Sequence, residues 1–400
     1  MVDTYERFRD GVRTYDLVIV VSLLWFMVQF LRFVFPPLFE TFQSTFAVTN
    51  TETGILFTAM MLAYSAVQFP SGVLGDRYGR PLVILVGASV FTGAALLVAA
   101  SPSFLVIMLG AVLIGLGTGP HKAVAIPLLS HKYEDRTGRA LGTMDTIGQF
   151  GGMVAPLVVV GVLSVFVWQG VFVLGAVVSA VLVVTFYVVV RGDTELRVKG
   201  SVSQSPDDGG DEGSTTSYLS VFSDRSLLVF VVVTMLFTFA WNGLSSFFPL
   251  FLATEKGLSS GMAGVLYSLL FVASVSQAVT GDLSDRMGRL RVSVVLFVFM
   301  SVGLAGLIAL ESLAALVLIT AVVGIGFHGF RPVRDSYLMD VIPDSVGGGT
   351  LGVIRTGMTA VGALAPAVTG YLSDTVGFVV AFLVLGTAAA IAGVLTFLLR

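Results

Sequence analysis

The sequence predicts an all-α membrane protein in which twelve transmembrane helices form two pseudo-symmetric six-helix bundles. Three observations lead to this prediction: apolar segments recur along the whole chain, charged residues make up only 12% of its 400 residues, and its two halves repeat each other. A soluble domain carries about 25% charged residues, so this chain has too few to cover a surface that faces water. We therefore expect most of the chain to lie in a lipid bilayer.

Each apolar segment is expected to be a helix, because lipid offers no hydrogen-bond partner to backbone N–H and C=O groups. About 20 helical residues cross the hydrocarbon core of a bilayer. The first half contains six such segments, at residues 16–39, 51–74, 81–100, 103–128, 139–162 and 167–190. The second half contains six more, at residues 226–252, 259–281, 291–310, 313–337, 348–370 and 376–399.

One long polar stretch separates the two sets of spans. Its core, GSVSQSPDDGGDEGSTTS, is rich in Gly, Ser and Asp and has almost nothing to bury, which is typical of a flexible linker. We therefore expect an N-terminal six-helix bundle over residues 1–191, a linker over 192–224 and a C-terminal six-helix bundle over 225–400.

The distribution of Lys and Arg predicts which loops are cytoplasmic. If the N-terminus is cytoplasmic, the outside loops contain a single basic residue, Lys256. Basic residues accumulate in the cytoplasmic loops of membrane proteins. The sequence therefore predicts a multi-pass protein of the cell membrane whose two termini and linker are all cytoplasmic.

The two halves match at an offset of 209 or 210 residues. The segment GVLGDRYGR, which begins at Gly72, matches GDLSDRMGR from Gly281, and LGTMDTIGQFGGMVAP from Leu141 matches LGVIRTGMTAVGALAP from Leu351. Both halves have the same helix order and topology, so the repeat is parallel, and such repeats hold a solute site at their interface. A duplicated structural membrane protein would have the same repeat. The motif inside the repeat is therefore needed to distinguish a protein with a solute site from a purely structural one.

That motif has the form G-x-L-x-D-R-x-G-R and lies between spans two and three and again between spans eight and nine. Its Gly, Asp and Arg positions are Gly72, Asp76, Arg77, Gly79 and Arg80 in the first copy and Gly281, Asp285, Arg286, Gly288 and Arg289 in the second. Glycine permits a tight turn, and Asp and Arg can bind helix ends and neighbouring charges. Charges needed only for topology would explain the Arg residues but not the Gly, the Asp or the spacing.

Through this repeated motif, nearly the whole chain resembles the major facilitator superfamily. The resemblance implies a transporter that works by alternating access, with the motif acting as a conformational latch on the cytoplasmic side. In span five, Gly151, Ala155 and Pro156 resemble the glycine–proline motif of antiporters in that family.

A charge inside an apolar span costs about 2.5–3.5 kcal/mol and normally faces a cavity or a partner. The candidates are Arg32 in span one, Lys122 in span four, Asp145 in span five, Arg331, Arg334 and Asp335 in span ten, and Arg355 in span eleven. Two interpretations are open. The carboxylates can neutralise basic residues as packing or gate pairs, or the excess of basic groups can line a cavity that attracts an anion.

The cavity interpretation and the gate interpretation each predict a set of site residues. We expect the solute cavity to be lined by Arg32, Lys122, Trp241, Asn242, His328 and Arg331. Helix packing would also account for Trp241 and Asn242. We expect a gate formed by Asp145, Arg334, Asp335 and Arg355, in addition to the latch motif.

The leading hypothesis is a secondary active transporter that moves a small organic anion by alternating access, coupled to an ion. A multidrug efflux antiporter for apolar or cationic compounds is the alternative within this class. A membrane receptor that kept the fold is an alternative of another class, although the short polar linker leaves little room for a signalling domain.

We expect no enzyme activity, no catalytic residues and no cofactor. The chain has no Walker sequence, and its three histidines give no metal cluster, so no metal site is predicted either. The net charge of −3 argues against nucleic acid as a partner. The expected partners are a small-molecule solute, a proton or sodium ion as the coupling ion, and membrane lipid, and the expected oligomeric state is a monomer.

Overall fold

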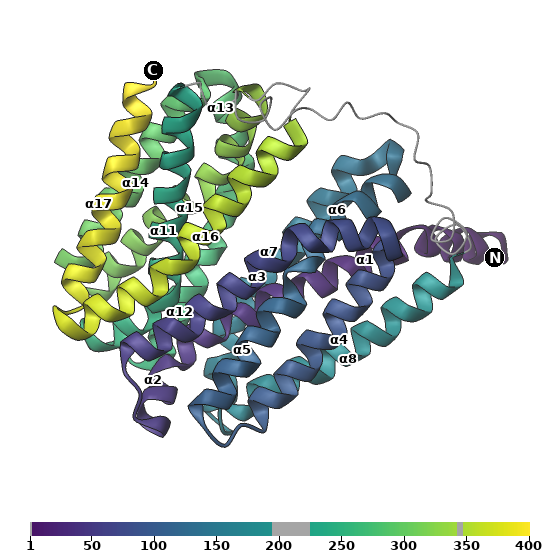
Figure 1. Ribbon diagram of the computed structural model, residues 1–400, viewed down its shortest axis with the longest axis horizontal. Coiled ribbons are helices and arrows are strands. Elements are labelled where there is room, and N and C mark those ends of the chain that lie inside the picture. Colours follow the sequence, from purple (N-terminus) through teal and green to yellow (C-terminus); the bar gives the residue numbers. More distant parts are fainter. Residues whose placement is uncertain (1, 194–224, 342–346) are drawn as a thin grey trace. The chain divides into compact units, whose positions relative to one another are not determined.

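The computed structural model describes residues 2–193, 225–341 and 347–400, and within them the side chains of residues 15–193, 225–341 and 357–400. These described residues are almost entirely helical and contain no β-strand (Figure 1). Eleven helical segments among them are long and apolar enough to cross a membrane, and α16 (Gly347–Thr375) is a further helix of 29 residues. The predicted all-α fold with twelve spans is confirmed. The predicted linker lies almost wholly outside the described residues.

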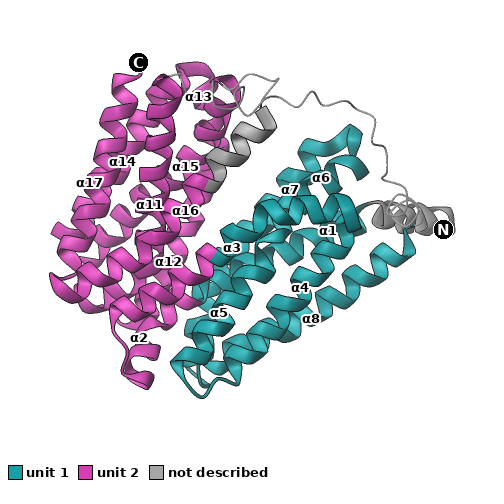
Figure 2. Cartoon of the chain, viewed as in Figure 1, with its two compact units in different colours: residues 1–34, 63–208 teal, residues 35–62, 209–400 magenta. Residues whose placement is uncertain are grey.

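The chain forms two compact units (Figure 2). Unit 1 contains residues 1–34 and 63–208, and unit 2 contains residues 35–62 and 209–400. The units therefore follow the two sequence halves except for residues 35–62, which come from the first half of the chain and pack with the second.

Unit 1 is built around α1, which packs mainly against α7 and α8, while α4 packs against α5, α6 and α8. Its helices are α1 (Val2–Phe33), the second part of α3 (Asn50–Tyr78), α4 (Arg80–Ala99), α5 (Phe104–Thr118), α6 (Pro120–Lys132), α7 (Thr137–Leu163) and α8 (Gln169–Gly192). A short 3-10 helix, Glu134–Arg136, joins α6 to α7.

Unit 2 is built around α11, which packs against α12, α16 and α17, while α14 packs against α15 and α17. Its helices are α2 (Phe35–Phe46), the first part of α3, α11 (Arg225–Thr254), α12 (Ser260–Val272), α13 (Ser276–Met287), α14 (Arg289–Ala309), α15 (Leu313–Val341), α16 and α17 (Phe378–Leu398).

Span one is longer than predicted and is an interrupted helix. It reaches Phe46 instead of residue 39, and it is divided into α1 and α2 after Phe33. Pro36 and Pro37 follow the break. A proline has no N–H and its ring hinders the carbonyl group four residues earlier, so these two residues weaken the helix where it divides. Arg32 lies in the last turn of α1, directly before the break.

Side-chain contacts bring the predicted cytoplasmic segments of unit 1 together. Arg136 donates a hydrogen bond of 2.6 Å to the Tyr15 hydroxyl, and Lys132 lies 2.8 Å from the Asp193 carboxylate. The start of span one, the turn between α6 and α7 and the end of α8 therefore lie at the same end of unit 1, as the predicted topology requires. The side of the membrane that this end faces stays a prediction.

Residues 35–62 are held in unit 2 by polar contacts with the C-terminal half. The Asp374 carboxylate, near the end of α16, accepts hydrogen bonds from the backbone N–H groups of Asn50 and Thr51, at 3.1 and 2.7 Å. The Ser260 hydroxyl donates to Glu40 at 2.8 Å. A carboxylate at the first N–H groups of a helix satisfies donors that have no partner inside the helix, and the helix dipole strengthens the contact.

Candidate functional site

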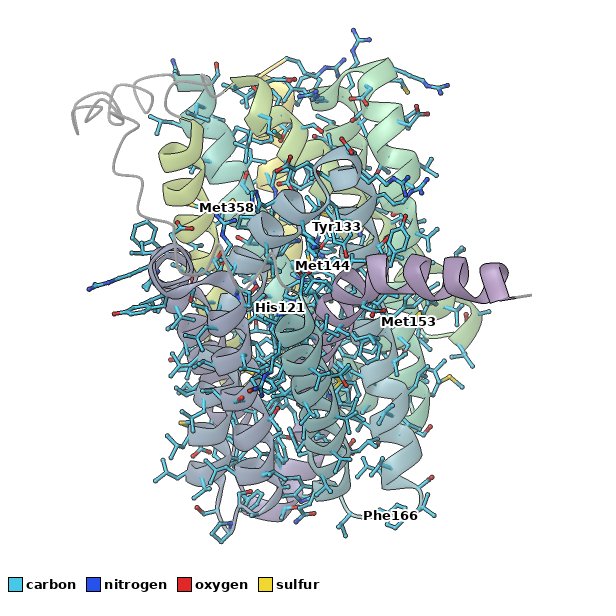
Figure 3. All side chains as sticks on the ribbon, turned by 90° about the vertical axis from the view of Figure 1, so that its right-hand side faces the viewer. His121, Tyr133, Met144, Met153, Phe166 and Met358 are labelled. Atoms are coloured by element: carbon cyan, nitrogen blue, oxygen red, sulfur yellow. The ribbon has the colours of Figure 1, made fainter. Side chains whose placement is uncertain are left out.

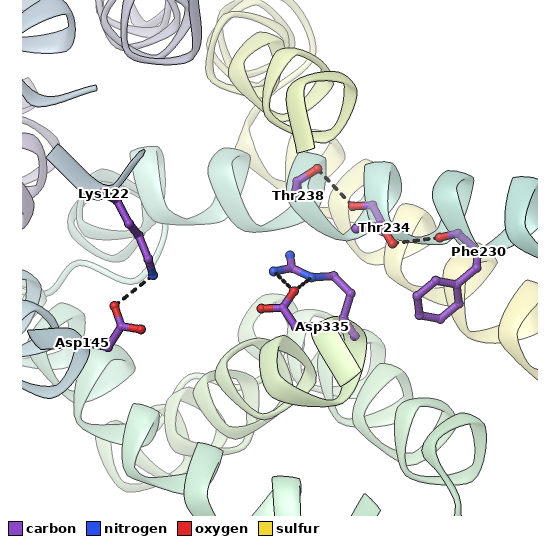
Figure 4. Close-up of polar contacts among 7 residues, drawn as sticks. Lys122, Asp145, Phe230, Thr234, Thr238 and Asp335 are labelled. Carbon is purple, nitrogen blue, oxygen red and sulfur yellow. Dashed lines mark hydrogen bonds and ion pairs between the residues drawn. The ribbon is translucent and has the colours of Figure 1, made fainter. Parts of the chain in front are cut away.

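Unit 1 contains a cation held between a carboxylate and an aromatic ring. Lys122 Nζ, on α6, donates a hydrogen bond of 2.9 Å to Asp145 Oδ1, on α7 (Figure 4). The same Nζ lies 5.5 Å from the centroid of the Trp25 ring, on α1, and that ring stacks on His121 with centroids 5.7 Å apart and planes 6° apart. We call these four residues the Lys122 cluster.

The aromatic side of the Lys122 cluster is tightly packed. A β-carbon at Gly148, one turn after Asp145 on α7, would lie 1.9 Å from Cδ1 of Trp25, so the indole ring occupies space that only glycine leaves. On α6, the His121 side chain is buried inside unit 1 (Figure 3), and its Nε2 lies 3.1 Å from the Val21 carbonyl oxygen. Helices α1, α6 and α7 thus fix the position of Trp25.

The charged side of the Lys122 cluster is open. The Lys122 side chain is 39% exposed and that of Asp145 is 49% exposed, whereas Trp25 is 5% exposed. Charged groups within transmembrane segments face the bundle interior or a water-filled cavity. We therefore expect the exposed side of this ion pair to face water.

Arg32 binds an aromatic ring of unit 1 at another position. It is 8% exposed, its guanidinium carbon lies 4.2 Å from the centroid of the Tyr64 ring on α3, and its Nη1 lies 3.3 Å from Gln29 Oε1. A guanidinium over an aromatic face is stabilised by cation–π attraction, more strongly where water is excluded.

Unit 2 contains a second cation over a tryptophan ring. The Arg331 guanidinium carbon, on α15, lies 4.9 Å from the centroid of Trp241, on α11. The fully buried His328, one turn earlier on α15, meets the same indole edge-on at 5.0 Å and the Phe271 ring at 5.8 Å. We call these four residues the Arg331 cluster.

The basic residues of the two clusters are related by the sequence repeat, whereas their tryptophans, Trp25 and Trp241, do not occupy corresponding positions. Arg331 follows Lys122 by 209 residues, the offset of the motif, and both lie over a tryptophan from the first helix of their own half. The sequence analysis did not find Trp25. One signal could have drawn attention to it, since the chain has only three tryptophans.

Three further residues of the predicted gate and cavity, Arg334, Asp335 and Asn242, are also placed. Arg334 bonds Asp335 in its own helix, with Nε and Nη2 at 2.8 and 2.7 Å from Oδ1 (Figure 4). Asn242 donates to the Thr238 carbonyl oxygen of its own helix at 3.0 Å, and a β-carbon at Gly362 would lie 2.6 Å from its Nδ2. This position fits the packing interpretation of Asn242.

The predicted gate between spans five and ten stays a prediction. In the structure, the carboxylates of Asp145 and Asp335 each bond a basic residue of their own unit. The side chain of Arg355 lies outside the described ones.

The two copies of the latch motif make corresponding contacts. Gly79 and Gly288, directly before α4 and α14, have φ values of +95° and +94°, which favour glycine. Arg80 Nη1 donates to the Pro127 carbonyl oxygen at 3.1 Å, and Arg289 Nη1 donates to the carbonyl oxygen 47 residues further on, that of Ser336. Each motif therefore binds the fourth span of its own half.

The acidic contacts of the latch differ between the copies. Asp76 pairs with Arg80 at 3.2 Å, whereas Arg289 pairs with Asp340 of α15. The other motif residues lie near the surface. Of the charged ones, Arg77 lies over the Tyr78 ring, Arg286 pairs with Asp282, and Asp285 is exposed. Of the glycines, a β-carbon at Gly72 would meet nothing within 4 Å, and one at Gly281 would meet only Pro332.

The described charges inside the spans are suited to binding an anion. Among the candidate charges whose side chains are described, four are basic, namely Arg32, Lys122, Arg331 and Arg334, and two are carboxylates, Asp145 and Asp335. Ammonium and guanidinium groups form charge-assisted hydrogen bonds with carboxylates and related anions. Within the described residues, no three His, Asp or Glu side chains lie together in a way that could hold a metal ion.

The chain is similar to known membrane transporters over almost its whole length. It is 26% identical to the hexuronate transporter of Bacillus subtilis over 375 residues, which cover 88% of this chain and 86% of that one. It is 23% identical to a probable sulfoacetate transporter of Cupriavidus necator, over 92% of this chain and 90% of the relative.

Solved transporter structures have the same fold. A bacterial homologue of the human lysosomal transporter Spinster, in an inward-facing and unoccupied conformation, matches with a TM-score of 0.75 and 14% identity, over 97% of this chain and 96% of that one. A D-xylose–proton symporter matches with a TM-score of 0.75 and 13% identity, over 96% of this chain and 97% of that one. The sequence model of the Major Facilitator Superfamily matches residues 21–276 and 230–400, and the chain therefore belongs to that superfamily of membrane transporters.

Proposed function

We propose that this chain is a secondary active transporter that carries a small organic anion across the cell membrane by alternating access, coupled to an ion. The observation that carries the proposal is that each half places a basic residue over a tryptophan, with the two basic residues at corresponding positions of the repeat. The Lys122 cluster is partly exposed, so a solute that enters from water can reach its charge.

The chemistry of the clusters favours an anion over other solutes. A carboxylate or sulfonate group can accept hydrogen bonds from Lys122 or Arg331, and the carbon skeleton beside it can pack on an indole ring. A lipophilic cation would meet like charges instead, and repulsion of this kind is how sites reject a wrong partner. This argument favours the anion over the multidrug alternative.

The relatives support the same class of solute. The hexuronate and sulfoacetate transporters are named for organic acids that carry a carboxylate or sulfonate group. At 26% and 23% identity they do not identify the solute of this chain, so the proposal extends to the class and no further.

The purified protein in liposomes tests the proposal. Uptake is measured for labelled glucuronate, sulfoacetate, neutral glucose and the lipophilic cation tetraphenylphosphonium, and we expect transport of at least one of the two anions. The substitution Arg331→Gln should lower kcat/KM for that anion about 10- to 150-fold, because a hydrogen bond to a charged group contributes about 1.5–3 kcal/mol.

Arg291→Gln is the matched control, because Arg291 is an exposed arginine at the start of α14. It should leave transport of the anion unchanged. Transport of tetraphenylphosphonium with no transport of either anion would contradict the proposal, and so would an unchanged kcat/KM in the Arg331→Gln protein.

A further inference from the structure

The Asp335 carboxylate on α15 has one oxygen that its arginine partner leaves open. Nε and Nη2 of Arg334 both lie against Oδ1, at 2.8 and 2.7 Å, and Figure 4 shows the second oxygen directed away from the guanidinium group. Within the described residues, no hydrogen bond or ion pair is recorded for Oδ2. Arginine–carboxylate pairs frequently use both oxygens, so the geometry of this pair leaves Oδ2 available to another donor.

Asp335 is also much more exposed than its partner. Its side chain is 46% exposed, whereas that of Arg334 is 14% exposed. Asp335 falls inside the predicted span 313–337, where a charged group normally faces a water-filled cavity or a partner. Since Oδ2 has no recorded partner within the described residues, a solute that arrives from water can reach it.

Arg331 lies on the same face of α15, four residues before Asp335. The separation corresponds to about 6 Å along the helix axis. Two buried rings of α11 hold the neighbouring cations in place: Arg331 lies 4.9 Å from the centroid of Trp241, and Arg334 lies 5.9 Å from that of Phe237. A site whose side chains are already ordered loses less entropy when a ligand binds.

The sequence repeat shows that the fold does not require the Arg334–Asp335 pair. At the offset of 209 residues, these two positions correspond to Ala125 and Ile126 in the first half. The first half therefore fills the same part of its fourth span with apolar side chains. Charged groups inside a span are costly and mark solute pathways and relays, so we attribute the extra pair of the second half to function.

Arg331 and Asp335 select two different groups on one solute. A guanidinium group only donates hydrogen bonds and suits a carboxylate, whereas an ionised carboxylate only accepts them and suits a hydroxyl or an ammonium group. A second anionic group would be repelled by Asp335. Together the two residues fit a solute that has an acidic group at one end and a hydrogen-bond donor about 6 Å away.

Charge balance decides between a hydroxyl and an ammonium group. On this face of α15, Arg331 and Arg334 contribute two positive charges and Asp335 contributes one negative charge. A singly charged anion brings the sum of these charges to zero, whereas a zwitterion leaves it positive and a dianion makes it negative. An uncompensated charge inside the membrane is unfavourable, so the donor that suits Asp335 is a neutral hydroxyl group.

We propose that the transported anion is a hydroxylated monocarboxylate of the sugar-acid type, whose carboxylate binds Arg331 and whose hydroxyl group donates to Oδ2 of Asp335. This inference rests on the proposed function and narrows its class of solute. It makes Asp335 a specificity-determining residue, because its charge repels an anion that has no hydroxyl group to offer. A plain carboxylate and the dianion sulfoacetate are disfavoured for this reason.

The experiment compares glucuronate with cyclohexanecarboxylate, which has the same ring size and charge but no hydroxyl group. Uptake into liposomes that contain the protein is measured after subtraction of uptake by protein-free liposomes. A hydrogen bond to a charged group predicts a wild-type kcat/KM about 10- to 150-fold higher for glucuronate than for cyclohexanecarboxylate. Sulfoacetate should also be transported less efficiently than glucuronate.

Asp335→Ala should affect the two ring compounds in different ways. Its kcat/KM for glucuronate should fall about 10- to 150-fold, because the hydrogen bond is lost. Its kcat/KM for cyclohexanecarboxylate should stay the same or rise, because a negative charge near that anion is removed. A purely structural role of Asp335 would lower both values alike.

Two further variants separate loss of the hydrogen bond from loss of the fold. Asp335→Asn keeps one acceptor oxygen and should keep part of the preference for glucuronate. The double substitution Arg334→Ala with Asp335→Ile copies the residues of the first half, leaves no arginine without its carboxylate and should remove the preference. The matched control is Asp282→Ala, which removes another carboxylate paired with an arginine of its own helix, at 2.9 Å, at an exposed position of α13. It should leave the ratio of the two kcat/KM values unchanged.

The outcomes separate this inference from the proposed function. If the wild type transports none of the anions, the proposed function fails. If it transports cyclohexanecarboxylate or sulfoacetate as efficiently as glucuronate, the inference is wrong while the proposed function stands, and this comparison needs no variant to fold. An Asp335→Ala protein that changes both ring compounds equally, or neither, would overturn the inference in the same way.

Discussion

Gly148 on α7 decides where the indole ring of Trp25 lies. A β-carbon at this position would overlap the ring, so Gly148→Ala must displace Trp25 or bend α7. Overpacking of this kind costs about 1–3 kcal/mol. We expect the substitution to lower the thermal unfolding midpoint in detergent, to change tryptophan fluorescence and to weaken binding of the anion.

Gly142 on the same helix provides the control, because a β-carbon there would meet nothing within 4 Å. Alanine is favoured over glycine inside a helix by about 0.5–1 kcal/mol, so Gly142→Ala should keep or raise the unfolding midpoint. Equal effects of the two substitutions would mean that the contact with Trp25 has no energetic importance.

At this scale, some of the site could be predicted from the sequence and some could not. The charges Lys122, Asp145 and Arg331 stand out because a charged group is rare and costly inside an apolar span. Trp25 is apolar in an apolar segment, and nothing in the composition of span one distinguishes a ring that packs under a cation from one that faces lipid.

The helix α3 begins with its first N–H groups bound to a carboxylate from α16. The Asp374 carboxylate accepts hydrogen bonds from the backbone N–H groups of Asn50 and Thr51 and from the Thr51 hydroxyl. Removal of the charge by Asp374→Asn should weaken this contact by about 0.3–2 kcal/mol, because a negative group at a helix N-terminus interacts with the helix dipole. Hydrogen exchange of the amides at the start of α3 should become about 2- to 30-fold faster.

Glu311→Gln is a suitable control for the α3 contact, since the carboxylate of Glu311 also forms an ion pair inside unit 2, with Lys256 at 2.8 Å. It should leave exchange at the start of α3 unchanged. Unchanged exchange in Asp374→Asn would mean that packing alone holds this helix end.

The packing of α3 could not be predicted from hydropathy. Lipid tails are as apolar as the side chains of a neighbouring helix, so hydropathy locates a span but does not indicate which helix it touches. The close approach depends on small residues: a β-carbon at Gly54 would lie 2.4 Å from the Pro366 carbonyl oxygen, and one at Gly370 would lie 2.3 Å from that of Asn50. Thr58 adds a hydrogen bond by accepting from Ala367 N at 3.0 Å.

For the whole molecule, we expect the latch motif to influence which side of the transporter is open. Asp76 pairs with Arg80, which also binds the carbonyl group of Pro127. We expect Asp76→Asn to loosen this contact and to favour the form open to the cytoplasm, with a change of about 2- to 5-fold in the ratio of the two forms. Folding and the affinity of each form should change little.

Spin-label distances between the two halves measure this ratio, and the absence of cysteine from the sequence allows labels at introduced cysteines. Asp282→Asn is the matched control. Asp282 forms a similar i,i+4 pair with Arg286 at 2.9 Å, but it occupies a variable position of the motif, since the first copy has Val73 there. Identical distance distributions in wild type and Asp76→Asn would remove the latch role.

The fold of the whole molecule was the most predictable feature. Span length, the scarcity of charge and the 209-residue offset each point to twelve helices in two repeats, because the bilayer allows few other solutions. The assignment of residues 35–62 to the second unit was not predictable, since it depends on contacts more than 300 residues apart.

This assignment also has a consequence for biosynthesis. Residues 35–62 leave the ribosome long before Pro366 and Asp374, their partners in α16. At about 5–20 residues per second, synthesis of the intervening 300 or so residues takes about 15–60 s. During that interval the Gly54 and Thr58 side of α3 is inserted without its partner helix, so lipid or a membrane chaperone must cover it until α16 is made.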